Sequence, residues 1–130
     1  MVLVDTHVVV WLAFEEEKLT KAARHAIRTA RREARGLAIC DFTLLELAML
    51  LGRGRIQVGL GLESFLQDVE SRFVALPITA KICAHSIHLP ASYPKDPGDR
   101  LIGATAIVNG IPLITADRAI RDSQAVQTIW

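Results

Sequence analysis

The stretch LAICDFTLLELAMLLG (residues 37–52) places a short apolar run directly before a longer segment rich in leucine. LAIC (37–40) predicts a β-strand. The residues from Thr43 to about Leu51 predict a helix, which the GRGR segment (52–55) ends. A strand that passes at once into a helix is the repeating unit of α/β folds.

The same alternation extends from this stretch toward both ends of the chain. Further strands are predicted at VLV (2–4), FVALPI (73–78), PLIT (112–115) and AVQTI (125–129). Further helices are predicted at 20–35, 62–71, 79–88, 99–109 and 117–122, with Thr20 capping the first and Gly36 stopping it. Such alternation implies a parallel sheet covered on both faces. We therefore expect a three-layer α/β/α sandwich.

Composition limits the class of protein. With 130 residues, 51% of them hydrophobic, the chain has the size and apolar content of a single domain over residues 1–130. A formal net charge of +1 does not by itself draw the chain to nucleic acid. Cys40 and Cys83 lack the CxxC spacing of a zinc site and do not suggest a disulfide framework.

The apolar N-terminal segment MVLVDTHVVVWLAF (1–14) resembles neither a signal peptide nor a membrane span. Asp5 and His7 interrupt it, and no basic region precedes it. We therefore expect a cytoplasmic protein that does not contact a membrane.

Acidic residues lie at or near the ends of predicted strands. Asp5 directly follows VLV, and Asp117 comes two residues after PLIT. Asp99 starts the predicted helix 99–109. If this helix begins at the same edge of the sheet, Asp99 also points toward that edge. Open parallel sheets bind their ligands beyond the carboxyl ends of the strands. We therefore expect these three carboxylates to meet at one edge of the sheet.

Glu46 is the only polar side chain between Leu44 and Leu51, on a helix that is apolar almost all round. A carboxylate buried there is costly unless it is hydrogen-bonded, paired or bound to a metal. One alternative is a T-x-x-E capping box, in which Glu46 bonds back to the backbone N–H of Thr43. The other three acids favour a role for Glu46 in the same site.

Four carboxylates around one cleft repel one another and would not stay ionised together without a cation. Mg²⁺ and Mn²⁺ prefer such oxygen ligands. An ion of this kind activates water and stabilises the charge on a phosphate under attack. The sequence therefore predicts metal-dependent phosphodiester hydrolysis.

Four motifs occur in order over essentially the whole chain: VLVDTHVVVWL, TLLELAML, DPGDRLIGATA and PLITADRAI. In this order they resemble the PIN-domain ribonucleases, specifically the VapC-type toxins of type II toxin-antitoxin pairs. The resemblance implies the PIN fold and Mg²⁺-dependent cleavage of RNA. It assigns the catalytic and metal-binding quartet as Asp5, Glu46, Asp99 and Asp117.

The resemblance also implies a VapB-type antitoxin as partner. In that family the antitoxin wraps an extended C-terminal segment over the toxin, and a basic side chain commonly approaches the acids. A guanidinium suits this role because it makes bidentate bonds to carboxylates.

Asp96 is the closest rival to Asp99. The acid of the resembled family is the one followed by arginine and two hydrophobic residues, as in DRLI, which selects Asp99. Asp96, together with Pro97, then shapes the turn or lies in the outer shell of the site. Many members of the resembled family have a histidine or a basic residue just before this segment. Pro94 and Lys95 stand there in this chain, so the resemblance carries over no role for a histidine.

Two threonines stand beside the acids. The hydroxyls of Thr6 and Thr115 are placed to orient carboxylates or metal-bound water. The preference of threonine for β-strands explains these residues equally well.

Arginines supply the candidate contacts to RNA. Arg24, Arg28, Arg31 and Arg35 recur at spacings of four, three and four, which aligns them in one stripe of the predicted helix. A solvated face is the alternative. If the substrate is RNA, the stripe is predicted to contact phosphates together with Arg53 and Arg55.

Other functions stay open at this point. A phosphatase of the haloacid-dehalogenase type wants D-x-D after the first strand, and a receiver domain wants an early acidic pair and a late lysine; both patterns are missing. A housekeeping PIN-type nuclease and a non-catalytic binding module with an acidic cleft are the remaining alternatives. Leucines in the Thr43 helix and in LGLESFL (60–66) favour a homodimer.

Overall fold

The protein is described by a computed structural model that covers residues 1–54, 58–59 and 61–130. The strands of this part of the chain form one parallel sheet in the order β3-β2-β1-β4-β5. They are β1 (Val2–Val4), β2 (Leu37–Cys40), β3 (Val74–Leu76), β4 (Leu113–Ile114) and β5 (Thr128–Ile129). The predicted parallel sheet is confirmed, with β3, β4 and β5 shorter than their apolar runs.

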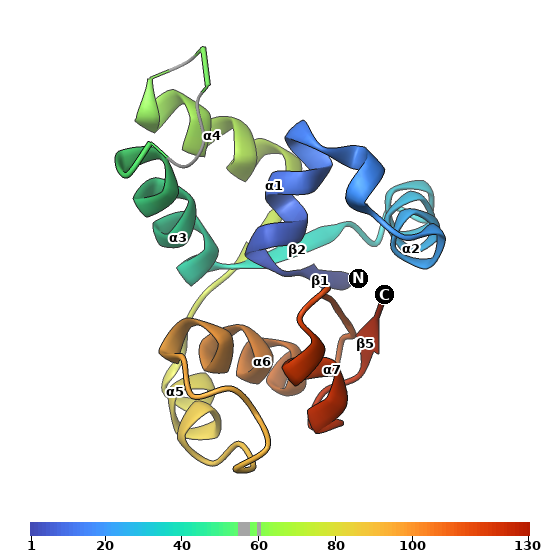
Figure 1. Ribbon diagram of the computed structural model, residues 1–130, viewed down its shortest axis with the longest axis vertical. Helices are drawn as coiled ribbons and strands as arrows, with labels where there is room; N and C mark the ends of the chain where they lie inside the picture. The colour runs from blue at the N-terminus through green and yellow to red at the C-terminus, as the bar shows by residue number, and fades with distance from the viewer. Residues whose placement is uncertain (55–57, 60) are drawn as a thin grey trace.

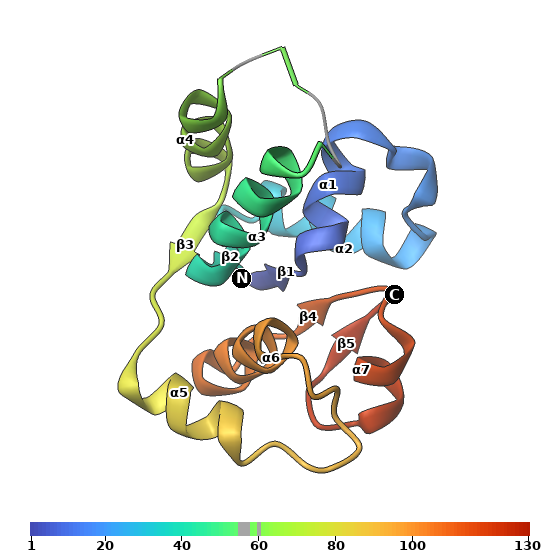
Figure 2. The same cartoon turned by 60° about the vertical axis from the view of Figure 1, so that its left-hand side comes forward.

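Helices cover both faces of the sheet, as Figures 1 and 2 show. The described helices are α1 (Thr6–Phe14), the 3-10 helix η1 (Glu16–Lys18), α2 (Lys21–Arg32), α3 (Asp41–Gly52), α4 (Leu62–Arg72), α5 (Ala80–Ile87), α6 (Pro97–Asn109) and α7 (Arg118–Ser123). The helices α1 to α4 pack on one face, α6 and α7 on the other, and α5 lies against α6. None of the described helices has the length and apolar character needed to cross a bilayer.

The central strands are buried on both faces because successive side chains point in opposite directions. Val4 and Ile114 belong to the core beneath α1 to α4, whereas their neighbours Leu3 and Leu113 belong to the core beneath α6 and α7. All four side chains are fully buried. This two-sided burial explains why the strands read as continuous apolar runs.

The strand order defines where a ligand site is expected. β1 pairs with β2 on one side and with β4 on the other. The chain winds outward from β1 through β2 to β3 and then returns to β4 on the opposite side. This reversal makes the gap between β1 and β4 the switch point, where α/β sheets bind ligands at the carboxyl ends.

Helix α1 is not predicted by the sequence pattern. Its segment THVVVWLAF contains three consecutive valines, and β-branched residues have low helix propensity. The fold overrides that preference, because Val8 and Val9 are buried in the core and Asp5 caps the first turn.

Two other helix boundaries differ from prediction. Thr20 caps α2 as expected, accepting from the backbone N–H of Ala23, but the helix ends at Arg32 instead of extending to residue 35. The backbone beyond it turns through left-handed conformations at Ala34 and Gly36. Helix α6 begins at Pro97, two residues before its predicted start.

Candidate active site

Asp5 is held rigidly at the carboxyl end of β1. It is the N-cap of α1, and its Oδ1 accepts a hydrogen bond from the Thr6 backbone N–H at 2.8 Å. Its Oδ2 accepts from the Thr115 hydroxyl at 2.7 Å. Burial raises the pKa of Asp5, while the hydrogen bonds from Thr115 and Thr6 oppose that rise. Both carboxylate oxygens therefore have fixed positions at the switch point.

Thr115 links Asp5 to Asp117. Its Oγ1 donates to Asp5 and also accepts from the backbone N–H of Asp117 at 3.0 Å. Asp117 caps α7 by accepting from the Ile120 backbone N–H at 3.0 Å. A single hydroxyl thus fixes the acids that follow β1 and β4 relative to each other.

Glu46 reaches the same edge from α3. The Thr6 Oγ1 lies 2.8 Å from Glu46 Oε1 and 3.1 Å from Thr43 Oγ1. Since a hydroxyl has one proton, Thr6 donates to the carboxylate and accepts from Thr43. Burial raises the pKa of Glu46, and the nearby charges of Asp5 and Asp96 add to that rise.

The capping-box alternative for Glu46 is wrong. Helix α3 starts at Asp41, its N-cap is Cys40, and no side-chain hydrogen bond caps it. Thr43 therefore lies inside the first turn, where its hydroxyl contacts Thr6 instead of the helix backbone. Glu46, the polar residue on this apolar helix, therefore hydrogen-bonds Thr6 of α1.

Asp99 lies in the first turn of α6 and is half-buried. Its backbone N–H donates to Asp96 Oδ1 at 3.1 Å, so Asp96 is the N-cap, in agreement with its predicted role in shaping the turn. Burial raises the pKa of Asp99 to about 7, with further contributions from the carboxylates of Asp5, Asp96, Asp117 and Glu46. The predicted acids therefore lie in one electrostatic neighbourhood.

The structure adds Tyr93, a residue that the sequence analysis missed. Its side chain is buried, and its hydroxyl donates to the main-chain oxygen of Asp99 at 2.6 Å. A Cβ atom at Gly103 would lie 2.2 Å from this hydroxyl, so the glycine lets the ring approach α6. Tyr93 is the only tyrosine of the chain and stands just before DPGD, which is the signal that could have found it.

The donor set tests whether a divalent ion suits this edge. Carboxylate and threonine oxygens are the groups present, and they match the ligands of Mg²⁺ and Mn²⁺. Within residues 1–54, 58–59 and 61–130, no three acidic, histidine or cysteine side chains form a ready cluster around one point. Mg²⁺ usually keeps several waters and binds through one or two carboxylates, so the residues fit a hydrated ion.

The predicted arginine stripe is wrong at one end. Arg24, Arg28 and Arg31 of α2 line a cavity of about 300 Å³ beside Glu16 and Glu17. Arg35 lies beyond the end of α2, with its Nε 3.5 Å from a carboxylate oxygen of Glu33.

The remaining arginine candidates lie elsewhere. Arg35 lines a cavity with Met1 and Pro112, which precede β1 and β4, so it stands at the edge of the sheet opposite the acids. Arg53 is exposed at the end of α3. Arg55 lies outside the described residues.

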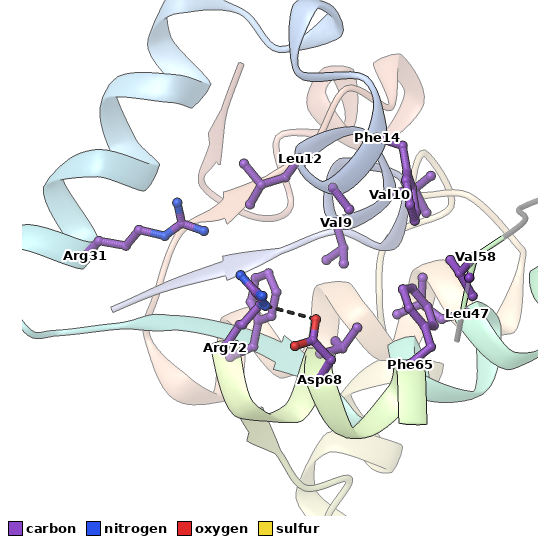
Figure 3. Close-up of a pocket in the computed structure, with 14 residues that line it drawn as sticks. Val9, Val10, Leu12, Phe14, Arg31, Leu47, Val58, Phe65, Asp68 and Arg72 are labelled. Atoms are coloured by element: carbon purple, nitrogen blue, oxygen red, sulfur yellow. Dashed lines mark hydrogen bonds and ion pairs between the residues drawn. The ribbon is translucent and has the colours of Figure 1, made fainter. Parts of the chain in front are cut away.

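A largely apolar groove runs between α1, α3 and α4, as Figure 3 shows, and its lining also includes the charged side chains of Arg31, Asp68 and Arg72. Its volume is about 490 Å³, and its walls include Val9, Leu47 and Phe65. The rings of Phe14 and Phe65 stack at its rim, with centroids 6.3 Å apart. Helix α3, which carries Glu46, thus forms a wall of both the groove and the acidic edge.

Comparisons with known proteins cover nearly the whole chain. A family model described as PIN domain matches residues 2–124. Ribonuclease VapC22 of Mycobacterium tuberculosis is 38% identical over 131 residues, which cover 99% of this chain and 98% of that protein.

Solved structures share the fold. VapBC2 from Rickettsia felis bound to a DNA fragment from their promoter aligns with a TM-score of 0.72 and 18% identity, over 98% of this chain and 97% of that one. DNA-bound VapBC from Salmonella typhimurium gives a TM-score of 0.73 at 17% identity, over 98% and 97% of the two chains. The predicted α/β/α architecture is confirmed.

Proposed function

The chain belongs to the PIN-domain family as a VapC-type member, and from this premise we propose that it is a metal-dependent endoribonuclease. The relative at 38% identity is named a ribonuclease, which supports RNA as the substrate class. The observation that carries the proposal is the acidic edge itself. There Thr115 hydrogen-bonds both the Asp5 carboxylate and the Asp117 backbone, and Thr6 hydrogen-bonds Glu46. The charges of these three acids add to the rise in the pKa of Asp99.

Asp5, Glu46, Asp99 and Asp117 would hold Mg²⁺ or Mn²⁺, which supplies an activated water and neutralises charge on the phosphate under attack. The threonines position these ligands. Thr115 fixes the rotamer of Asp5, and Thr6 does the same for Glu46. Because both bonds form within the folded protein, the carboxylates need little reorganisation at the moment of reaction.

Proton release from Asp99 is coupled to binding of the cation. Its pKa of about 7 leaves a large fraction of this carboxyl protonated at neutral pH. Ligand carboxylates must be ionised, so Asp99 releases its proton when a cation binds. The affinity for the cation therefore rises with pH through this range.

Substitution of the acids tests the proposal. Asp5→Asn and Asp117→Asn should each lower cleavage of a panel of structured RNAs by at least about a hundredfold, because each removes one ligand charge. Asp122→Asn, an exposed acid of α7, is the matched control and should cleave normally. Cleavage that survives both EDTA and Asp5→Asn would contradict the proposal.

The assignment within DPGD has its own test. Asp96→Asn should be milder than Asp99→Asn, because Asp96 uses one oxygen to cap α6. If Asp96→Asn abolishes cleavage while Asp99→Asn leaves it intact, the roles of the two acids are reversed.

We also propose that the chain is the toxin of a toxin-antitoxin pair. One solved neighbour of the same fold is a toxin-antitoxin complex by name. Expression of the chain alone should arrest growth, and a VapB-type protein encoded beside it should restore growth. A chain that cleaves RNA but is harmless would be a housekeeping nuclease. One that binds Mg²⁺ without cleaving RNA would be a binding module.

We propose that the groove between α1, α3 and α4 is the binding site for the antitoxin. Its lining is mostly apolar, it is large enough to take several side chains, and α3 forms its boundary with the acidic edge. A segment lying in it could extend a basic side chain to the carboxylates.

Two further proposals concern surfaces. Leu45 and Met49 are exposed one turn apart on α3, and we propose that this face forms a homodimer. Sedimentation should show a monomer for Leu45→Lys.

The arginines of α2 are proposed to contact RNA, so Arg24→Gln with Arg28→Gln should flatten the salt dependence of binding by about one unit per lost contact.

A further inference from the structure

A separate cavity lies between α5 and α6. Its volume is about 460 Å³, and it is lined by Ser86, Ile87, Lys95, Pro97, Arg100 and Leu101. The described lining includes two cations and no carboxylate. None of the roles assigned above uses this cavity.

Arg100 is held in place within this cavity. Its Nη1 donates to the main-chain oxygen of Ser86 at 3.0 Å, which ties the guanidinium of α6 to α5. A guanidinium has five N–H donors in one plane, so a single bond orients the group and leaves most donors for other acceptors. The ion pairs of the described residues include neither Arg100 nor Lys95.

The two cations immediately flank the acids of the candidate active site in sequence. Lys95 precedes Asp96, and Arg100 follows Asp99. Neighbouring residues of a helix point about 100° apart, so one turn of α6 presents Asp99 to the acidic edge and Arg100 to α5. Negative and positive lining thus lie side by side around the start of this helix.

A polyanion that reaches the acidic edge meets repulsion from the carboxylates. Cations next to that edge offset the repulsion and raise the local concentration of the polyanion. A phosphodiester chain continues on both sides of the bond to be cleaved, so a phosphate beside the scissile one needs a place to lie. Arginine binds phosphate through two parallel N–H bonds, and lysine adds a mobile point charge.

We propose that Lys95 and Arg100 bind a backbone phosphate of the RNA substrate, next to the phosphate at the acidic edge. The inference rests on the proposed ribonuclease function for the identity of the polyanion. It assigns the α5–α6 cavity a role in binding the strand, without a role in the chemical step. The contact is to phosphate, so it adds affinity equally for all RNA sequences.

Binding of a labelled single-stranded oligoribonucleotide of mixed sequence tests this site. Fluorescence anisotropy is measured on an Asp5→Asn background, which keeps the strand intact, across a series of salt concentrations. Lys95→Gln should reduce the salt slope by about 0.7, the value for one contact to single-stranded nucleic acid. Lys81→Gln, an exposed lysine of α5, is the matched control and should leave the slope unchanged.

Arg100→Lys keeps the charge but removes the planar fork, so it should weaken binding without changing the salt slope. Kinetics with the Asp5 side chain intact provide a second readout. Lys95→Gln should raise KM and leave kcat unchanged, as expected when binding is lost equally from the ground state and the transition state.

A set of oligonucleotides, each with one neutral methylphosphonate linkage, locates the contact. The parent protein should lose affinity at one linkage beside the cleavage position, and Lys95→Gln should lose nothing further there. A purely structural role of Lys95 would produce no such dependence on a single linkage.

The outcomes separate this site from the proposed function. Cleavage with equal salt slopes for Lys95→Gln and Lys81→Gln would overturn the phosphate site and leave the ribonuclease standing. The predicted slopes without any cleavage would support the site and reject the ribonuclease. If Lys95→Gln weakens capture of the antitoxin but leaves RNA binding unchanged, the cavity binds protein and the proposal is wrong.

Discussion

Single hydroxyl groups organise the candidate active site. Thr115 contacts Asp5 and the backbone of Asp117, and Thr6 contacts Glu46. Each threonine lies one or two residues from one acid and bonds to another acid that is distant in sequence. Loss of one hydroxyl therefore removes a bond to one carboxylate and, at Thr115, also a bond to the backbone that positions a second acid.

Thr115→Val tests this link because valine has nearly the same shape as threonine and lacks the hydroxyl. Asp5 Oδ2 would lose its donor while still buried, so the carboxylate would become harder to ionise. Mg²⁺ affinity, measured by calorimetry, should fall by about tenfold to a hundredfold. Thr128→Val on β5 is the control, and equal losses in both variants would contradict the link.

Asp99 should make the stability of the metal-free protein depend on pH. Its pKa in the folded state, about 7, lies above the ordinary value of 3.8, so ionisation of Asp99 disfavours the folded state. The contribution of the protonated carboxyl is fully present below pH 3.8 and is lost as the pH rises to about 7. Thermal unfolding in EDTA should therefore show a falling midpoint over this window.

Asp99→Asn should flatten the same curve, since asparagine does not titrate. Adding Mg²⁺ should raise the midpoint of the parent protein more at pH 8 than at pH 5, because the ion needs ionised carboxylates. Parallel curves for parent and variant between pH 4 and pH 7 would show that other groups control the dependence.

At the scale of elements, α6 carries one function on each of its faces. Its first turn presents Asp99 to the acidic edge and Arg100 to α5, and its buried face packs on the sheet through Ile102 and Ala106. Tyr93 anchors the start of the helix from the preceding loop. The position of Asp99 thus depends on how closely this loop packs against α6.

Gly103→Ala tests the packing between Tyr93 and α6. Alanine favours helix over glycine by about 1 kcal/mol, but its Cβ would lie 2.2 Å from the Tyr93 hydroxyl. Overpacking should win and lower the free energy of unfolding by about 1–3 kcal/mol in denaturant titrations. Gly52→Ala has nothing within 4 Å of its new Cβ and should not destabilise the protein. A Gly103→Ala variant as stable as the parent would contradict this packing.

At the scale of the whole molecule, helices and loops divide the surface into regions with different chemistry. The acidic edge lies at the switch point, the cavity of Lys95 and Arg100 lies beside it, and the apolar groove lies across α3. Helices α3 and α6 connect these regions, because α3 borders both the groove and the acidic edge and α6 carries both Asp99 and Arg100. A partner bound in the groove could thereby block the site without resembling RNA.

Phe14→Ser should weaken antitoxin binding while cleavage of RNA stays unchanged. Phe14 is 47% exposed and stacks on Phe65, so its removal reduces the apolar area of the groove at little cost to stability. The affinity of the purified pair gives the measurement. Val74→Ser, an apolar and 44% exposed position outside the groove, is the control. Equal affinities of Phe14→Ser and the parent protein for the antitoxin would exclude the groove as the antitoxin-binding site.

The sequence by itself determined the features that depend on neighbours along the chain. Apolar runs between helical segments identified all of the strands in the described structure, and Asp5 and Asp117 were assigned to strand ends because they closely follow VLV and PLIT. The cap at Thr20 was equally readable, since a cap bonds only three residues ahead. The α/β/α class follows from this local order.

The tertiary structure alone decided the features that join distant segments. Helix α1 forms because Val8 and Val9 are buried in the core, against the local preference of a valine run. Glu46 bonds Thr6 instead of capping its own helix, and Tyr93 finds the backbone of Asp99 in the space left by Gly103. The strand order that sets the switch point is likewise a matter of packing. Sequence patterns record local hydrogen bonding and which residues are apolar, whereas these contacts depend on which surfaces meet after the chain has folded.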